Sequence, residues 1–491
     1  MAEVPHAESI EEPSVDLGGY RQELKRTLGP FQVFAISFAF ISVVVGIFGT
    51  YDDVLQTSGP VGIWLWIIVA FGQTLVALVI AQFAARISLT GSSYQWASRL
   101  ANPRIGWGFG WVSYCYLAIA VVACDDAMAS QAFMPLVGLG PDEHTARLIT
   151  LALLVVQAVL ASASTRIVAI LNASAVGVEV VIVVVLVIAL GIAIAITGEG
   201  SAANLTSRGI TENAPNYFTV GGGLMMAMIM GLTTITGFEA AANLAEEAED
   251  PYRSVPRAIV GSVAAAGLLG MLFLIALTFA MHDIPRVSAS DIPVAVILRD
   301  QLGPVMERTL LVAVTFAFFG AGMVILTTCS RIVYAMARDS RFPAHRLKQR
   351  VDPRTQTPVP ATILVLVVGV ILMVAMPGAA LLKLITASTI LPTLLYVSTT
   401  VLYLSVRRRL DRKEGGFDLG RYELPVAIGA LVWCLFALFV LVAPAEALIP
   451  VLIVVGLLLA GGVYFAYLLV RHPEVLETEP SKSSALADVV I

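Results

Sequence analysis

Charged side chains are scarce in this sequence. Asp, Glu, Lys and Arg make up 13% of its 491 residues, whereas they make up about 25% of an ordinary soluble domain. Apolar residues account for 58% of the chain, and many of them lie in nearly uncharged runs of about 20 residues. This composition excludes a water-soluble globular protein and indicates a chain that crosses a membrane many times.

Cysteine and histidine are also rare. The four cysteines, Cys115, Cys124, Cys329 and Cys434, lie in apolar segments without CxxC spacing, so neither a disulfide framework nor a zinc site is indicated. The five histidines form no HExxH pair, and Walker and GxSxG motifs are missing. Lys and Arg form no aromatic-interleaved patch typical of nucleic-acid binding. We therefore expect no enzyme, no metal, no cofactor and no nucleic-acid partner.

Twelve apolar segments are long enough to cross a bilayer, since a spanning helix needs about 20 mostly apolar residues. Segments such as 178–196 lack the alternation of a transmembrane barrel strand, so helices are the only spanning structure left. The sequence therefore predicts an all-α membrane protein with twelve transmembrane helices. The predicted spans are 31–54, 61–85, 107–136, 145–162, 166–197, 220–244, 257–281, 308–337, 358–376, 380–406, 424–443 and 447–470.

The distribution of Lys and Arg predicts the orientation, because cytoplasmic loops retain these residues. With the N-terminus inside, 24 of the 30 Lys and Arg residues lie on the cytoplasmic side and six lie outside. We therefore expect both termini in the cytoplasm and the chain in the plasma membrane. The cytoplasmic tails 1–25 and 471–491 are rich in Glu, Ser and Pro and are expected to be disordered.

Segment 92–102 follows the second span and carries apolar residues at helical spacing, among them Tyr94, Trp96 and Leu100. Two interpretations stay open for it. The segment is either a short helix at the membrane surface or an ordinary loop with aromatic residues near that surface.

Two spans contain Gly and Thr clusters that are candidates for an interruption of the helix. The first is Gly46–Thr50 and the second is Thr233–Glu239. Their separation along the sequence is about the length of a half that contains five helices. In transporters, two interrupted helices at corresponding positions of inverted halves leave backbone groups free to bind the substrate. Glycine also permits close packing of membrane helices, so uninterrupted helices stay open as the alternative.

Several motifs resemble those of the amino acid/polyamine/organocation superfamily of permeases. The longest runs from Gly237 to Glu247, continues to Ile259, and resembles the sixth-helix signature of this superfamily. Segment 416–421, followed by Leu424 and Pro425, resembles the amino acid/choline transporter branch in particular. The supporting segments are 91–96 with Pro103, 106–111, 330–339 and Phe342 with Pro343.

The resemblance implies a fold similar to that of the leucine transporter, with two inverted five-helix repeats and two further helices. The first repeat would be 26–197, the extracellular loop 198–219, the second repeat 220–406 and the last two helices 407–470. The resemblance also implies that the substrate is an amino acid, choline, a polyamine or a related amine, moved by proton coupling or by exchange.

The resemblance further assigns substrate-binding positions in the first and sixth helices. Backbone amides of the first helix would receive a substrate carboxylate at a half-helix N-terminus, at Val44, Val45, Gly46 and Ile47. Valines replace two usually small residues there, which favours a substrate without a carboxylate. The sixth helix would offer carbonyls to an ammonium group at Thr233, Ile235, Thr236 and Gly237. The small side chain of Thr233 would leave a roomy pocket, with Phe238 as a gate.

Carboxylates in membrane spans cost about 2.5 to 3.5 kcal/mol each on insertion scales, so those in this chain are candidates for function. Asp52 and Asp53 in the first span and Asp125 and Asp126 in the third are expected in the outer halves of their helices. Two interpretations stay open for these pairs. They form either an acidic vestibule that attracts cations or solvated and paired groups near the surface.

Two glutamates in spans have more specific expectations. Glu179 lies in the fifth span, where the resemblance implies an ionisable residue facing the first and eighth helices. A carboxyl group in a low-dielectric site can bind and release a proton, so we expect Glu179 to couple transport to protons, with a structural hydrogen bond as the alternative. We expect Glu239 to fix the interrupted segment by bonding freed backbone amides.

Two expectations concern the inner side of the membrane. The acidic cluster after the sixth span is expected to be solvated and to face Arg residues of nearby loops; it comprises Glu246, Glu247, Glu249 and Asp250. Coupling to Na+ stays open, because carbonyl and hydroxyl ligands around Thr327 or Ser330 would leave no distinctive pattern.

Together these features predict a secondary active permease for an organic amine such as choline, a polyamine or a cationic amino acid. Its partners would be this small molecule and the lipid bilayer. The alternative within the same class is a permease or antiporter for zwitterionic amino acids. A channel would need a continuous polar file through the bundle, which the sequence does not show, and a sensor that binds without transport is less favoured.

Overall fold

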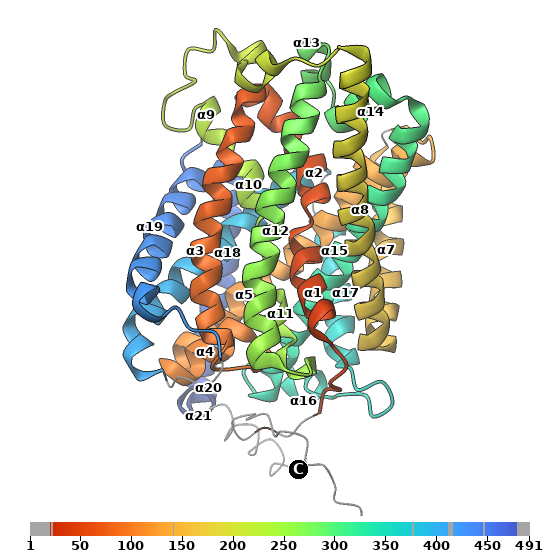
Figure 1. The fold of residues 1–491 in the computed structure, drawn as a ribbon. Helices are drawn as coiled ribbons and strands as arrows, with labels where there is room; N and C mark the ends of the chain where they lie inside the picture. Colours follow the sequence, from red (N-terminus) through yellow and green to blue (C-terminus); the bar gives the residue numbers. More distant parts are fainter. Residues whose placement is uncertain are drawn as a thin grey trace, which may run out of the picture.

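A computed structural model shows a bundle of helices that run roughly along one direction between two ends of the molecule (Figure 1). It describes residue 20 and residues 23–140, 142–375, 378–410, 416–444 and 447–478, without the side chains of 378–386. Within this part of the chain the regular structure is helical, and one isolated bridge joins Leu28 and Ala248. The predicted all-α class is confirmed.

The α-helices of the first half are α1 (Pro30–Ile41), α2 (Val43–Thr57), α3 (Leu65–Ala84), α4 (Ser92–Leu100), α5 (Pro103–Ala127), α6 (Met134–Leu136), α7 (Glu143–Ala163) and α8 (Thr165–Thr197). A π-helix, η2 (Met128–Phe133), joins α5 to α6. Those of the second half are α9 (Gly223–Met226), α10 (Met228–Thr234), α11 (Ala240–Asn243), α12 (Pro251–Ala280), α13 (Ile284–Ser288), α14 (Pro293–Leu302), α15 (Pro304–Arg338), α16 (His345–Lys348), α17 (Val359–Ala375), α18 (Gly378–Val406), α19 (Glu423–Val442), α20 (Leu448–Arg471) and α21 (Pro473–Glu477).

Local sequence explains where several helices begin. The side chains of Asn102, Asp142 and Ser164 each accept a hydrogen bond from a backbone N–H in the first turn of the helix that follows. These residue types satisfy amides that have no partner within the helix. Pro103 occupies the first position of α5, where its fixed φ suits the helix and its missing N–H costs nothing.

Ten helical segments among the described residues are long and apolar enough to span a membrane, with α1 and α2 counted as one segment. Two shorter apolar helices, Gly223–Thr234 and Val359–Ala375, occupy the places of the predicted sixth and ninth spans. The chain is thus a multi-pass membrane protein, as predicted. The count of twelve spans stays a prediction.

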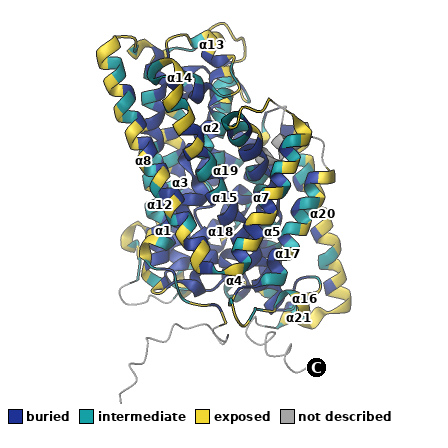
Figure 2. Cartoon of the chain, turned by 90° about the vertical axis from the view of Figure 1, so that its right-hand side faces the viewer, coloured by how far each residue is buried: buried dark blue, intermediate teal, exposed yellow. Residues whose placement is uncertain are grey.

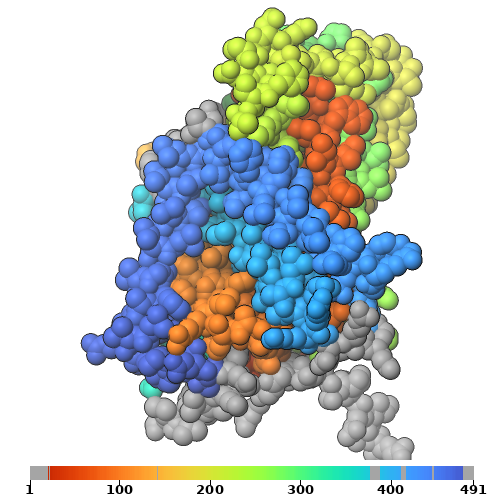
Figure 3. All heavy atoms as spheres, turned by 90° about the vertical axis from the view of Figure 1, so that its left-hand side faces the viewer, coloured from red at the N-terminus to blue at the C-terminus, as the bar shows by residue number. Residues whose placement is uncertain are grey.

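The spans differ in how far they are buried. In the spans that contain α1 with α2, α5 and α15, 72% of the most apolar window is buried, against 22% for α8 and 17% for α20. Figure 2 shows exposed residues gathered on outer helices, and Figure 3 shows α19 and α20, in blue, on one face. Exposed residues of α8 and α20 such as Val181, Ile188 and Leu459 are apolar, as contact with lipid requires.

The described ends of the chain lie at the same end of the bundle, which we call the terminal end (Figure 1). There the Tyr20 hydroxyl donates to Asp339 at 2.6 Å, and burial raises the pKa of Tyr20 so that the hydroxyl keeps its proton. The buried guanidinium of Arg341 donates to the carbonyls of Val475 and Thr478. Both chain ends are therefore tied to the segment that follows α15.

Most of the two predicted tails, namely 1–19, 21–22 and 479–491, lies outside the described residues. The helix expected at 92–102 is present as α4, but its residues 92–98 are buried. Trp96 is 1% exposed and donates to the carbonyl of Ile87. The helical interpretation therefore holds, while a position on the membrane surface does not fit this burial.

Two buried ion pairs lie at the terminal end. Arg331 donates to Glu247 at 2.8 Å with both side chains fully buried, and Arg338 donates to Glu246 at 3.0 Å. The expectation of a solvated acidic cluster is therefore wrong for these two glutamates, although the other two members are exposed. Their partners lie on α15, and they are paired because an unpaired buried charge would be strongly destabilising.

Candidate functional site

The first span is interrupted at Ser42, between α1 and α2. Ser42 adopts a left-handed conformation with φ 36° and ψ 89°, which L-residues rarely take. The Gly46 amide donates to the Ser42 carbonyl at 2.9 Å, but no described backbone donor reaches the carbonyl of Ile41. The interruption thus lies one turn before the predicted segment Gly46–Thr50, which is helical within α2.

A carboxyl group from another helix lies at this interruption. Glu179, near the middle of α8, is 2% exposed, and one of its oxygens accepts from the Val44 amide at 3.0 Å and from the Ser42 hydroxyl at 3.2 Å. These donors lie at the N-terminus of α2, where unpaired amides and the helix dipole favour negative charge. The interruption therefore lies at the residues that Glu179 contacts, and not at Gly46 or Gly49.

The sixth predicted span is interrupted between Thr234, the last residue of α10, and Ala240, the first of α11. Gly237 has φ 74°, in the left-handed region that glycine adopts without a steric penalty. No described backbone donor reaches the carbonyls of Ile235 and Thr236. This interruption lies within the predicted segment 233–239.

Two tyrosines from different helices hold the second interruption. Tyr116 of α5 donates to one oxygen of Glu239 at 2.8 Å, and Tyr396 of α18 donates to the other at 2.7 Å. The Tyr396 hydroxyl also accepts the Gly237 amide at 2.9 Å. Glu239 therefore fixes the broken segment through tyrosine hydroxyls, whereas the sequence predicted direct bonds to freed amides.

The two interruptions contact each other. The Ser37 hydroxyl of α1 donates to the carbonyl of Phe238 at 2.7 Å. A Cβ atom on Gly46 would overlap the side chain of Thr234, and one on Gly237 would overlap the ring of Phe40. Glycine at these two positions thus permits the broken segments to pack together.

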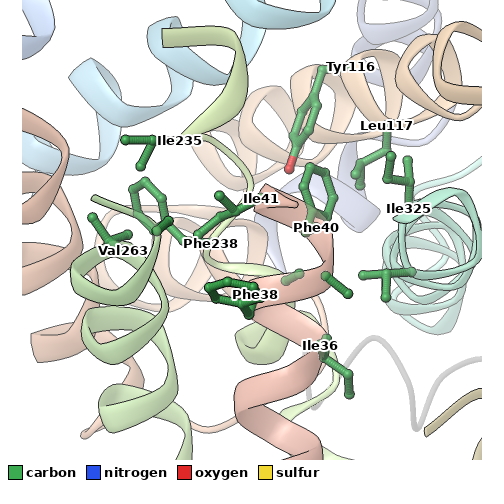
Figure 4. Packing of buried hydrophobic residues seen from close by; sticks show 14 of the residues in the cluster. Ile36, Phe38, Phe40, Ile41, Tyr116, Leu117, Ile235, Phe238, Val263 and Ile325 are labelled. Carbon is green, nitrogen blue, oxygen red and sulfur yellow. The ribbon is translucent and has the colours of Figure 1, made fainter. Parts of the chain in front are cut away.

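A cavity of about 130 Å³ lies beside both interruptions, which is room for on the order of ten water molecules. Figure 4 shows Phe40 and Ile41 of its wall at the end of α1, with Tyr116 of α5 nearby. No charged side chain of the described residues lines the cavity. Its polar lining residues are Thr50, Tyr116, Cys124, Gln131, Thr233, Thr234, Thr236, Ser388 and Thr389.

The predicted substrate-binding residues divide into two groups. Those that line the cavity are Val45, Gly46, Thr233 and Thr236. Those that pack behind its walls are Val44, Ile47, Ile235, Gly237 and Phe238. Phe238 is fully buried and stacks on Tyr396 with ring centroids 5.0 Å apart, so it does not act as a gate over the cavity in this structure.

None of the four aspartates expected to attract cations lines the cavity. Asp125 is fully buried and accepts from the Gln157 amide at 2.8 Å, and Asp126 is 9% exposed. A vestibule role for these two finds no support, because a buried carboxyl group offers a dissolved cation little access. Asp52 is half-buried and Asp53 is exposed on α2, so their role stays a prediction.

Sequence reasoning missed Gln131, which lines the cavity from η2. Its carboxamide oxygen is buried without a described donor and would lie 3.4 Å from a Cβ atom on Gly49. Short π-helices are frequent at functional sites. The one sequence signal for an irregular helix here is Pro135. Proline has no N–H, so it cannot donate the usual helical hydrogen bond to the carbonyl of Gln131, four residues earlier.

Comparisons with known proteins cover nearly all of this structure. A model of the amino acid permease family matches residues 28–461. The amino-acid permease BAT1 of Arabidopsis thaliana is 26% identical over 442 residues, 84% of this chain and 85% of the relative. The GABA-specific permease of Saccharomyces cerevisiae is 26% identical over 452 residues, 87% of this chain and 77% of the relative. A putative polyamine transporter of Candida albicans is 24% identical over 445 residues, 86% of this chain and 79% of the relative.

Proposed function

Because the chain belongs to the amino acid permease family, whose members are transporters and not enzymes, we propose that it is a secondary active permease for a small organic amine or amino acid. Alternating access between two inverted halves, 26–197 and 220–406, would expose the cavity to each side of the membrane in turn. The size of the cavity suits a small molecule.

The observation that carries this proposal is a neutral cavity between two interrupted helices. Interrupted helices of transporters provide backbone groups for binding near the middle of the bilayer. Ile41 and Thr236 line the cavity, and no described backbone donor reaches their carbonyls. Such carbonyls and the lining hydroxyls are acceptors for the N–H donors of a primary ammonium group, whereas the quaternary ammonium group of choline has no N–H and would be attracted by its charge alone.

The first interruption favours recognition of the amine end of the substrate. The Val44 amide at the start of α2 is already bonded to Glu179, which leaves fewer amides for a substrate carboxylate. This favours an amine without a carboxylate, such as choline or a polyamine, over an amino acid. The putative polyamine transporter among the relatives is named for molecules with ammonium groups and no carboxylate, whereas the GABA-specific permease is named for a zwitterion.

We assign proton coupling to Glu179. As a carboxylate it holds the Val44 amide and the Ser42 hydroxyl by charge-assisted hydrogen bonds, which are about twice as strong as neutral ones. Protonation removes this charge and weakens both bonds at the start of α2. A proton would thereby change the interruption that adjoins the cavity, which links proton binding to substrate binding.

We place the terminal end of the bundle in the cytoplasm and the chain in the plasma membrane. The excess of Lys and Arg on this side, 24 of 30 residues, supports the orientation. The buried pairs of Arg331 with Glu247 and Arg338 with Glu246 would then lie on the cytoplasmic side.

Counterflow into liposomes tests the proposal. Purified full-length protein would be reconstituted, loaded with an unlabelled amine, and offered labelled choline, putrescine, GABA, arginine or leucine. We expect saturable counterflow for at least one amine and its accumulation under an inward proton gradient. Thr236→Val, which removes a lining hydroxyl at nearly constant size, should weaken the affinity.

The matched control is Thr309→Val, on the exposed outer surface of α15, which should leave the affinity unchanged. Binding without counterflow would identify a sensor and overturn the proposal. Flux that does not saturate would identify a channel. Transport of leucine alone would keep the permease and overturn the preference for an amine.

A further inference from the structure

A second buried carboxyl group lies one layer behind the wall of the cavity. Cys124 of α5 and Ala321 of α15 line the cavity, and their chain neighbours Asp125 and Gly322 meet behind it. Asp125 is fully buried, and its Oδ1 accepts from Nε2 of Gln157 on α7 at 2.8 Å. The three helices α5, α7 and α15 thus converge on this pair.

The contact is tight and leaves no space for solvent on the α15 side. A Cβ atom on Gly322 would overlap both Asp125 Oδ1 and Gln157 Nε2. Rotating the carboxamide of Gln157 would place its oxygen against the carboxyl oxygen, so the observed orientation follows from Asp125 itself. The pair is therefore a buried and closely packed contact between the three helices.

Two acceptor atoms of the pair have no described donor. They are Asp125 Oδ2 and Gln157 Oε1, which are both buried. Leaving such atoms unsatisfied costs about 1 to 3 kcal/mol each. A proton on Oδ2 converts that atom from an acceptor without a donor into a donor, which makes the carboxyl group neutral.

Among the described residues, no cation forms an ion pair with Asp125. Arg147, the basic residue of α7, lies about three turns from Gln157 and pairs with Glu143 at 2.8 Å. An ionised and unpaired carboxylate in a membrane interior is unfavourable by several kcal/mol, and it is relieved by protonation. The other ionisable residues of the elements packed here are Arg104, Tyr114, Cys115, Tyr116, Cys124 and Asp126 on α5, Glu143, His144 and Arg147 on α7, and Glu307, Arg308, Cys329, Arg331, Tyr334 and Arg338 on α15, while η2 and α17 contain none.

We propose that Asp125 is a second proton-binding site, which is occupied while the contact of α5 and α7 with α15 is closed and releases its proton when that contact opens to water. This inference rests on the proposed function, since the opening is a step of alternating access. The group bound is a proton, held on Oδ2 and released to water. Asp125 acts on the substrate through the cavity wall and is a positioning residue.

The site differs from Glu179 in what the proton does. Glu179 has two donors directed at its charge, so deprotonation strengthens its contacts. Asp125 has one amide donor and one bare oxygen, so protonation removes a buried charge and gives the bare oxygen a hydrogen to donate. Proton binding should therefore close the α5, α7 and α15 contact while it loosens the start of α2.

Infrared spectroscopy of the purified full-length protein tests the site without requiring transport. A protonated carboxyl group gives a C=O stretching band that shifts in D2O and is distinct from the bands of carboxylates and amides. We expect Asp125→Asn to remove one such band at neutral pH, because Asn copies the shape of the protonated acid without its titration. Gln157→Ala should shift the band without removing it, since the carboxyl group loses its amide donor.

The matched control is Asp291→Asn, in an exposed loop, which should leave the carboxyl bands unchanged. An unchanged band in Asp125→Asn would overturn the inference, as would a band in the same place in Gln157→Ala. A lower proton-to-substrate ratio in Asp125→Asn, with exchange retained, would support it. If the wild-type protein shows the band but no counterflow, the proposed permease function fails while the proton site stands.

Discussion

The two interrupted helices are held by buried carboxyl groups in opposite ways. At the first, Glu179 belongs to a distant helix and accepts directly from the Val44 backbone amide. At the second, Glu239 belongs to the broken segment and accepts from the hydroxyls of Tyr116 and Tyr396. One carboxyl group thus binds peptide groups of another helix, while the other is enclosed by side chains.

This difference predicts a switch at Glu179, which would respond to a change in its own charge, and a structural support at Glu239. A carboxylate bonded to the first amides of a half-helix is sensitive to its own charge, because those amides favour an anion. A carboxylate between two tyrosine hydroxyls forms a closed network whose loss leaves several buried polar groups unpaired. We therefore expect substitutions at Glu239 to affect folding and those at Glu179 to affect coupling.

The largest effect is expected for Glu239→Ala. This change leaves the buried Tyr116 hydroxyl without a described acceptor, at about 1 to 3 kcal/mol, and leaves the Tyr396 hydroxyl only the Thr236 hydroxyl at 3.4 Å, so it should abolish all modes of transport. Thermal unfolding of the detergent-solubilised protein would measure the loss. Glu199→Ala, in an exposed loop, is the matched control, and equal stability of the two variants would remove the distinction between support and switch.

The next effect is expected for Glu179→Gln. The carboxamide can still accept from the Val44 amide but cannot change its charge, so accumulation driven by a pH gradient should be lost while exchange persists. Counterflow and gradient-driven uptake, measured on the same liposomes, separate these modes. Glu199→Gln should preserve both modes, and intact accumulation in Glu179→Gln would assign coupling to another group.

The sequence located the second interruption but not the first, and the comparison explains why. The motif at 233–239 contains Gly237 and Glu239 themselves, so the residues that shape the break are local. The break at Ser42 depends on Glu179, 137 positions away, and no local pattern records a contact between distant helices. Glycine at Gly46 serves close packing against Thr234, which was the alternative to an interruption there.

The same limit explains the misjudged acidic cluster and the missed residues of the site. Glu246 and Glu247 follow a span and have the pattern of solvated charges, but their partners Arg338 and Arg331 are 92 and 84 positions away. Tyr396 and Gln131 lie in apolar spans without a distinguishing motif. In contrast, the spans themselves could be predicted, because hydropathy is a local property that lipid imposes on each helix separately.

An intermediate effect is expected where the two interruptions touch. Gly46→Ala places a Cβ atom within the space of the Thr234 side chain, and overpacking of this kind costs about 1 to 3 kcal/mol. Counterflow should slow several-fold because the two broken segments move apart. The double variant Gly46→Ala with Thr234→Gly returns the space and should recover most of the rate, and failure to recover would show that the contact does not limit transport.

The smallest effect is expected for Asp52→Asn combined with Asp53→Asn. These residues lie on α2 beyond the interruption and do not line the cavity. They can therefore act on a cationic substrate only through long-range electrostatic attraction as the substrate approaches the cavity. Charges in contact with water interact by about 1 kcal/mol at 4 Å, which is about fivefold in Kd, and salt screens this attraction. Affinity for a transported cation, measured at low and high ionic strength, should fall less than this at low salt and be unchanged at high salt. A loss that persists at high salt would mean that one of these carboxylates binds the substrate directly, and the neutral cavity would then no longer be the whole of the binding site.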